Sequence, residues 1–169
     1  MNPPQAASGA TGPGMPDRAD ALQRAALREL PGNPEGDRQI TFVELGADPA
    51  QSAPFAVLRV YWIHGLRAGD RRGDHAHREM QQLLVATSGS LRVELDDGQA
   101  RREFLLDRPT RGLWVPAGLW RRIQVLADGT TLLALASTHF EESDYIRDYD
   151  AFVDFARART GADPAPDGA

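Results

Sequence analysis

The chain has 169 residues, of which 41% are hydrophobic and 25% charged, and its formal net charge is -5. These values suit a single domain with a sizeable core, and the negative charge disfavours nucleic acid or an acidic membrane as partner. Cysteine is absent and all 19 basic residues are arginine, which excludes thiolate chemistry and a lysine Schiff base. No apolar run approaches the ~20 residues of a membrane span. The N-terminal residues lack a basic region followed by an apolar core, so we expect no signal peptide and a cytoplasmic protein.

The first 36 residues are predicted to form a flexible tail. Residues 1–20 are rich in Pro, Gly, Ala and Ser, a composition typical of disorder. The segment ALQRAALREL (21–30) favours a short helix, which the following PGNPEGD ends. The folded domain is therefore expected at 37–158, and a second flexible tail at 159–169.

Inside this domain the pattern is strand after strand. Alternating or β-rich runs predict strands at 39–45 and 55–64, three strands within 81–107 and three more within 111–137. The sequence DDG between two alternating runs is a hairpin signal. Only YDAFVDFARAR (149–159) has helical periodicity, which predicts a short C-terminal helix. About eight short strands with close turns predict an all-β sandwich or barrel.

Two of the four histidines lie two residues apart in RRGDHAHREMQQ (71–82). Residues i and i+2 of a strand face the same side, so His75 and His77 project together while the small Ala76 turns away. A polar pair at the mouth of a barrel is a typical setting for a small-ligand site. An isolated pair of this kind is, however, more often a pair of hydrogen-bonded core or surface histidines.

The residues around the pair resemble the first motif of the cupin superfamily. Gly69, His75, His77, Gln82 and Gly89 follow its spacing, with Gln82 where the family has a Glu ligand. The second motif, Pro-x-Gly-x-x-His, corresponds to PAGLWR (116–121), with Arg121 in place of the final His ligand. Two histidines, a neutral amide and a cation make a poor divalent-metal site, so no metal is expected.

Four segments, RRGDHAH, LLVATSGSLRVELDDG, LDRPTRGLWVPAGLW and SDYIRDYDAF, together resemble the sugar 3,4-ketoisomerases. These are metal-free, WxcM-like cupins that act on dTDP-linked 4-keto-6-deoxyhexoses. The resemblance implies a cupin-type jelly-roll β-barrel and an isomerase that moves the keto group from C4 to C3 through an enediol or enediolate. It also implies a dTDP-linked keto-deoxysugar as ligand, no cofactor, and a place in deoxysugar and polysaccharide biosynthesis. Cupins of this size are commonly dimers, so we expect a homodimer in which the strand at 39–45 pairs across the interface.

Such a reaction needs a base of near-neutral pKa and donors aimed at the developing oxyanion. We expect His77 to remove the carbon proton and His75 to handle the oxygen proton, and the reverse assignment stays open. The expected substrate contacts are Arg71, Arg72, Gln82, Arg121, Trp120, Tyr61 and His64.

Each of these residues is expected to contact the substrate for a different reason. Arg71 and Arg72 suit a phosphate or sugar, and the spacing nominates Gln82, rather than its neighbour, to face inward. Arg121 cannot act as a base but suits an enediolate or phosphate, and Trp120 lies beside it and can stack on a ring. Tyr61 and Trp62 point opposite ways, and which faces inward stays open. His64 stands where the family often has Tyr.

Two other functions remain open on the sequence alone. The first is a non-catalytic cupin module that binds a nucleotide sugar or assists a partner enzyme, which ligand binding without turnover would reveal. The second is a metal-dependent cupin oxygenase, which stoichiometric metal in the purified protein would support. Gln82 and Arg121 argue against the second.

Overall fold

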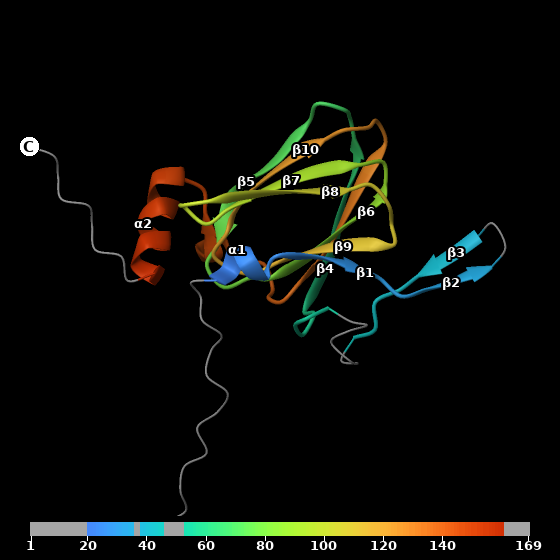
Figure 1. Cartoon of the computed structure of the whole chain (residues 1–169), viewed down its shortest axis with the longest axis horizontal. Helices are drawn as coiled ribbons and strands as arrows, with labels where there is room; N and C mark the ends of the chain where they lie inside the picture. Colours follow the sequence, from blue (N-terminus) through green and yellow to red (C-terminus); the bar gives the residue numbers. More distant parts are fainter. Residues whose placement is uncertain (1–19, 36–37, 46–52, 161–169) are drawn as a thin grey trace, which may run out of the picture.

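Two five-stranded antiparallel sheets face each other and form a jelly-roll β-barrel (Figure 1). The computed structural model describes residues 20–35, 38–45 and 53–160. The strands are β1 (Ala26–Glu29), β2 (Gly32–Glu35), β3 (Arg38–Thr41), β4 (Arg59–Leu66), β5 (Arg71–His77), β6 (Gln82–Ser88), β7 (Leu91–Asp96), β8 (Arg101–Leu106), β9 (Arg111–Val115), β10 (Trp120–Val125), β11 (Thr130–Ala136) and β12 (Tyr145–Ile146). The helices are α1 (Ala21–Arg24), the 3-10 turn η2 (Glu142–Asp144) and α2 (Tyr149–Thr160). The predicted all-β barrel with a short C-terminal helix is confirmed.

One sheet has the strand order β1-β9-β6-β11-β4, and the other has the order β12-β5-β10-β7-β8. The main core lies between them because alternate residues of each strand point inward. Leu91, Val93 and Leu95 of β7 are fully buried there, and they belong to the same apolar cluster as Leu84 and Ala86 of β6. Polar side chains that enter this container must therefore find partners inside it.

The strands predicted within 81–107 and 111–137 are present as β6 to β8 and β9 to β11. The DDG signal also forms the expected hairpin between β7 and β8. The Asp96 carboxylate accepts a 2.7 Å hydrogen bond from the Gly98 N–H, and the Asp97 carboxylate accepts from the Gln99 N–H at 2.9 Å. These side-chain bonds to the backbone stabilise the tight turn.

The predicted helix over 21–30 is only partly correct. It ends at Arg24, and the chain continues as β1, which pairs antiparallel with β9. Leu22 and Ala25 are buried in the main core, and the Arg102 guanidinium donates to their carbonyl oxygens at 2.8 and 3.1 Å. Contacts with the barrel override local helix propensity here. Residues 21–29, which the sequence predicts to lie in a flexible tail, therefore belong to the barrel.

Two further boundaries differ from the predictions. The strand expected at 39–45 is the shorter β3, which pairs with β2 in its own chain to form a separate hairpin (Figure 1). The strand expected at 55–64 begins only at Arg59, where pairing with Ala136 of β11 starts. At the C-terminal end, α2 continues to Thr160, past the predicted start of the tail. The tail predictions for residues 1–19 and 161–169 lie outside the described residues. Within the described part, no helix is long and apolar enough to cross a membrane.

Candidate active site

A β-bulge in β5 brings the two histidines into the barrel. Opposite β5, Arg121 of β10 pairs with His75 and the next residue pairs with Gly73, so Asp74 is an extra, unpaired residue. Gly73 and Asp74 have φ of 84° and 51°, and a Cβ on Gly73 would lie 2.8 Å from the Arg121 carbonyl oxygen. A glycine is therefore required where the bulge approaches β10.

After the bulge, normal alternation places His75 and His77 on the same face, as expected. Their ring centroids are 5.0 Å apart in an edge arrangement. Ala76 points the other way and packs in a second apolar cluster with Ile146 and Phe152. His77 is nearly inaccessible, with 3% of its surface exposed, while His75 is only part-buried.

Arg121 lies at the centre of the site. Its Nη2 is 2.5 Å from His75 Nε2 and 2.6 Å from His77 Nε2, and its Nη1 donates to Gln82 Oε1. The side chain is deeply buried, and burial lowers its pKa from the ordinary value. Because a guanidinium can only donate hydrogen bonds, both Nε2 atoms must be acceptors.

These contacts determine the tautomer of each imidazole. With Nε2 accepting, each ring carries its proton on Nδ1. The Nδ1–H of His75 donates to the Gly73 carbonyl oxygen at 2.8 Å, and the Nδ1–H of His77 donates to Asp144 Oδ2 at 2.8 Å. The bulge thus orients one histidine and a carboxylate orients the other, and both rings are neutral with their lone pairs directed at the same cation.

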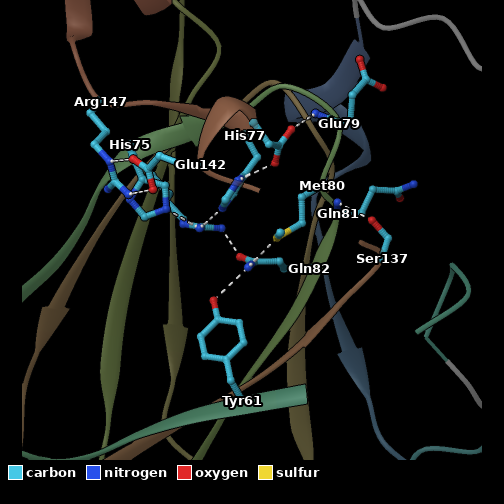
Figure 2. Close-up of polar contacts among 12 residues, drawn as sticks. Tyr61, His75, His77, Glu79, Met80, Gln81, Gln82, Ser137, Glu142 and Arg147 are labelled. Carbon is cyan, nitrogen blue, oxygen red and sulfur yellow. Dashed lines mark hydrogen bonds and ion pairs between the residues drawn. The ribbon is translucent and has the colours of Figure 1, made fainter. Parts of the chain in front are cut away.

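Gln82 and Tyr61 complete the interior cluster (Figure 2). Gln82 is 1% exposed, and its amide donates to the Tyr61 hydroxyl at 2.9 Å and to Met80 Sδ at 3.3 Å. Gln82 is therefore the inward residue of the Gln81–Gln82 pair, as the spacing nominates. Tyr61, and not Trp62, faces the interior, which resolves the open alternative on β4.

Asp144 and Tyr145 also belong to the site, and neither is predicted from the sequence. Asp144 ends η2, and its Oδ1 accepts from the Glu79 N–H at 2.7 Å, so both carboxylate oxygens are engaged. Tyr145 begins β12, which pairs with β5 next to His77, and its ring lies 4.9 Å from the ring of His75 and 4.3 Å from that of His77. Both occur in SDYIRDY, a segment noted for its resemblance but given no chemical role.

Charged side chains surround the more exposed side of the cluster. Figure 2 shows Arg147 and Glu142 beside His75, and the two side chains form an ion pair at 2.9 Å. The Arg147 guanidinium also lies 4.4 Å from the ring centroid of Tyr145. Arg59 covers Tyr61 at 4.8 Å, and its Nη1 is buried without a hydrogen-bond partner among the described residues.

Four predicted contacts lie elsewhere. Trp120 neighbours Arg121 on β10, so alternation turns it to the outer face, where it packs against Tyr149 and Phe152 of α2. His64 is exposed on the opposite face of β4 from Tyr61, because strand alternation also turns it outward.

The two arginines before the bulge also lie away from the histidines. Arg71 lines an outer groove with Arg92, Glu94 and Arg122. Arg72 is exposed and donates to the Arg71 carbonyl oxygen at 3.2 Å. None of these four side chains contacts the histidine cluster.

The electrostatics keep both histidines neutral. Burial, followed by the Arg121 cation, lowers the pKa of His75 from 6.5 to about 4 and that of His77 to about 2. A protonated imidazole here would face a buried guanidinium and would lose the hydrogen bond at Nε2. The site therefore holds two unprotonated bases throughout the physiological pH range.

These shifts predict an acid-sensitive fold. In the unfolded chain the histidines titrate near 6.5, so between that pH and about pH 4 the unfolded state binds more protons than the folded state. The free energy of unfolding should therefore fall as the pH is lowered from 7 to 5. Urea denaturation of the wild type and of His75→Asn at both pH values checks this. The variant should lose less stability over that interval, and an equal loss in both proteins would contradict the assignment.

Within the described residues, no group of three or more His, Asp or Glu side chains is arranged to hold a metal ion. The space between the two histidines is instead taken by the Arg121 guanidinium. The arrangement is suited to proton transfer beside a fixed positive charge.

Comparison with known proteins points to one family. The model of the family described as FdtA, WxcM-like, C-terminal, matches residues 24–157. The TDP-4-oxo-6-deoxy-alpha-D-glucose-3,4-oxoisomerase of Aneurinibacillus thermoaerophilus is 40% identical over 102 residues, which cover 60% of this chain and 73% of that protein.

Solved structures of sugar ketoisomerases share the fold. A 3,4-ketoisomerase from Helicobacter canadensis superposes with a TM-score of 0.73 at 30% identity, covering 79% of this chain and 98% of that one. QdtA, a sugar 3,4-ketoisomerase from Thermoanaerobacterium thermosaccharolyticum in complex with TDP, gives 0.75 at 31% identity, covering 82% and 98%. A variant of QdtA in complex with TDP-4-keto-6-deoxyglucose gives 0.74 at 30% identity, covering 80% and 95%.

Proposed function

The chain belongs to the WxcM-like family described as FdtA, and from this premise we propose that it isomerises a dTDP-linked 4-keto-6-deoxyhexose, moving the keto group from C4 to C3. Its relatives are TDP-sugar 3,4-ketoisomerases, which are intramolecular oxidoreductases acting on such sugars. The observation that carries the proposal is the pair of neutral histidines whose Nε2 atoms converge on one buried guanidinium.

The reaction requires two kinds of proton transfer. The C4 ketone acidifies the C3 proton, and a base removes it to give an enediolate with negative charge on O4. A proton is then delivered to C4, and the hydroxyl proton moves from O3 to O4. Substrate and product have the same composition, so the conversion as a whole consumes no oxidant or reductant. It needs a base that is unprotonated near neutral pH and a cation near the oxygens.

His75 is the better candidate for the base at carbon. It is part-buried, whereas His77 is almost fully enclosed, so the ring of His75 is the more accessible to a substrate. Its ring is held by the Gly73 carbonyl, which keeps the lone pair on Nε2. His77 and its partner Asp144 then serve the oxygen proton. This order reverses the one that the sequence favoured.

Arg121 is the candidate for enediolate stabilisation. Its hydrogen-bond acceptors among the described residues are two imidazoles and an amide, all of them neutral. Neutral partners do not fully compensate the cost of burying the positive charge of Arg121. An oxyanion that forms beside the guanidinium is therefore strongly stabilised. Because the guanidinium is held in place before the substrate binds, little reorganisation is needed when charge develops on O4.

Arg59 and Arg147 are the candidates for the diphosphate. Both lie close enough to His77 to lower its pKa through their positive charge, and Arg59 has a buried nitrogen without a partner among the described residues. In this role they take the place of Arg71 and Arg72, the phosphate contacts that the sequence predicts, because those two side chains lie away from the histidine cluster. Guanidinium groups bind phosphate oxygens well because their fork of donors matches the oxygen geometry.

A homodimer remains part of the proposal. Ile40 and Phe42, in and just after β3, are 59% and 39% exposed, and Val60 and Trp62 of the edge strand β4 are 50% and 62% exposed. Large apolar side chains beside a sheet edge are typical of an interface. Sedimentation equilibrium should give twice the chain mass, and a monomer at micromolar concentration would rule out this part of the proposal.

The activity is tested with dTDP-4-keto-6-deoxyglucose. After treatment with a chelator, the protein should convert it to a 3-keto product that proton NMR detects. Measurable binding without any product would instead support the binding-module alternative. Activity that depends on a stoichiometric metal would contradict the proposed chemistry.

A further inference from the structure

A surface groove lies on the outer side of Asp144. It has a volume of about 290 Å³ and is lined by Arg78, Glu79, Thr138, Glu141, Ser143 and Asp144. Four of these residues are exposed, so water reaches the groove. The side chain of Asp144 is itself 10% exposed, while that of its partner His77 is 3% exposed. Asp144 therefore lies between a buried base and bulk water.

The two nitrogens of His77 face different environments. Nε2 lies in the barrel interior, 2.6 Å from Arg121, and Nδ1 lies 2.8 Å from the Asp144 carboxylate. An imidazole that accepts a proton on one nitrogen readily releases the proton of the other, so a ring placed in this way connects its two sides. The backbone holds the carboxylate firmly, because the Glu79 N–H donates to Oδ1 and the Arg78 N–H donates to the Asp144 carbonyl oxygen.

We propose that Asp144 and His77 form a proton route between the barrel interior and the groove, separate from the opening through which the sugar enters. This inference rests on the proposed function for its role in turnover. His77 Nε2 accepts the O3 proton of the enediolate, the Nδ1 proton passes to Asp144 Oδ2, and Asp144 releases it to water in the groove. The reverse sequence returns a proton from water to O4, so protons balance and no electrons are transferred.

Such a route gives the buried histidine access to water while the substrate fills the barrel. In the proposed arrangement the nucleotide sugar lies over the more exposed side of the cluster, where His75 and Arg147 are, and would slow proton exchange by that path. None of the residues that line the groove is among the proposed substrate contacts, so we expect the groove to stay open when the substrate is bound. The hydroxyl proton can then be exchanged without release of the enediolate intermediate.

The route itself is tested without reference to activity. In protein labelled with 15N-histidine, NMR measures the exchange of the His77 Nδ1–H with water. Asp144→Asn keeps one oxygen that can accept the hydrogen bond from His77 Nδ1–H, places its amide nitrogen at the Glu79 N–H, and cannot take the proton, so exchange should slow by at least about tenfold. Ser143→Ala, which changes the groove without touching His77, should leave the rate unchanged. Equal exchange in Asp144→Asn and wild type would overturn the route.

The role in turnover is tested by rescue. Asp144→Asn should lower kcat on the order of 10²-fold, with thermal unfolding confirming that the variant is folded. Asp144→Ala connects the groove to His77, so added formate should restore part of its activity and should not restore that of His77→Asn. A wild-type kcat in Asp144→Asn, or no response of Asp144→Ala to formate, would overturn this role. An inactive wild type would refute the proposed function, while the exchange measurement would still decide the route.

Discussion

Arg121→Met is expected to lower kcat by about 10²- to 10³-fold, because it removes the only buried cation that the described residues place between the two histidines. Methionine fills a similar volume without donors, so the barrel should stay folded. The substrate's diphosphate lies away from Arg121 in the proposed arrangement, so KM should change much less than kcat. Stopped assays on dTDP-4-keto-6-deoxyglucose measure both constants.

The same substitution has an electrostatic signature. Arg121 is the second-largest cause of the low pKa of each histidine, after burial itself. Without it, the pKa of His75 should rise from about 4 towards its ordinary value of 6.5, which NMR titration of the imidazole detects. Arg92→Met is the matched control, since Arg92 lies on the outer face of the same sheet. A histidine pKa unchanged by Arg121→Met, or a kcat loss as large in the control, would contradict the assigned role.

His75→Asn and His77→Asn should fail at different steps. Without His75 no base reaches the C3 proton, so both C3 exchange and product formation should fall by about 10³-fold. Without His77 the enediolate still forms, so C3 exchange should persist while product formation drops. Proton NMR in deuterated water reports both quantities in one experiment. The opposite pattern, with exchange retained only in His75→Asn, would restore the assignment that the sequence favoured.

Asparagine is a suitable replacement because it keeps an amide near the original hydrogen-bond partners. His139→Asn provides a control for the substitution itself, since His139 is exposed outside the cluster. Binding of the nucleotide TDP should be similar in all three variants, because the proposed diphosphate contacts come from Arg59 and Arg147. A loss of TDP binding in either site variant would mean that the histidines act mainly in recognition.

The site residues that could be predicted from the sequence are those that lie in short motifs with a regular spacing. His75 and His77 share a face because of strand periodicity, and the motif spacing selected Gln82 over its neighbour. Arg121 could be predicted because it stands where the second cupin motif has its final His ligand. All four side chains do meet in the interior, within one hydrogen-bonded cluster.

The incorrect contacts arise from strand alternation. Trp120 is expected in the site because it is next to Arg121, but adjacent strand residues face opposite sides, so its side chain packs against α2. His64 is expected there because it stands where the family often has Tyr, but its side chain lies on the solvent-exposed face of β4. Arg71 and Arg72 precede a bulge whose extra residue the sequence does not reveal. The pattern Gly-Asp before the first histidine is its only local sign.

Asp144 could not be found by spacing because 67 residues separate it from His77. Only the return of the chain as β12 against β5 brings the two together. The same holds for α1 and β1, whose burial depends on contacts with β9 and Arg102 rather than on local propensity. Long-range pairing of this kind is decided by the whole fold and not by a local pattern.

The most direct test of the central claim follows the C3 proton of dTDP-4-keto-6-deoxyglucose in deuterated water, with chelator-treated wild-type protein and His75→Asn side by side. The neutral histidine pair on a buried arginine predicts that the C3 signal disappears in the wild type as 3-keto product forms, and that it persists in the variant. A C3 signal that remains in the wild type despite binding of the sugar nucleotide would contradict the account.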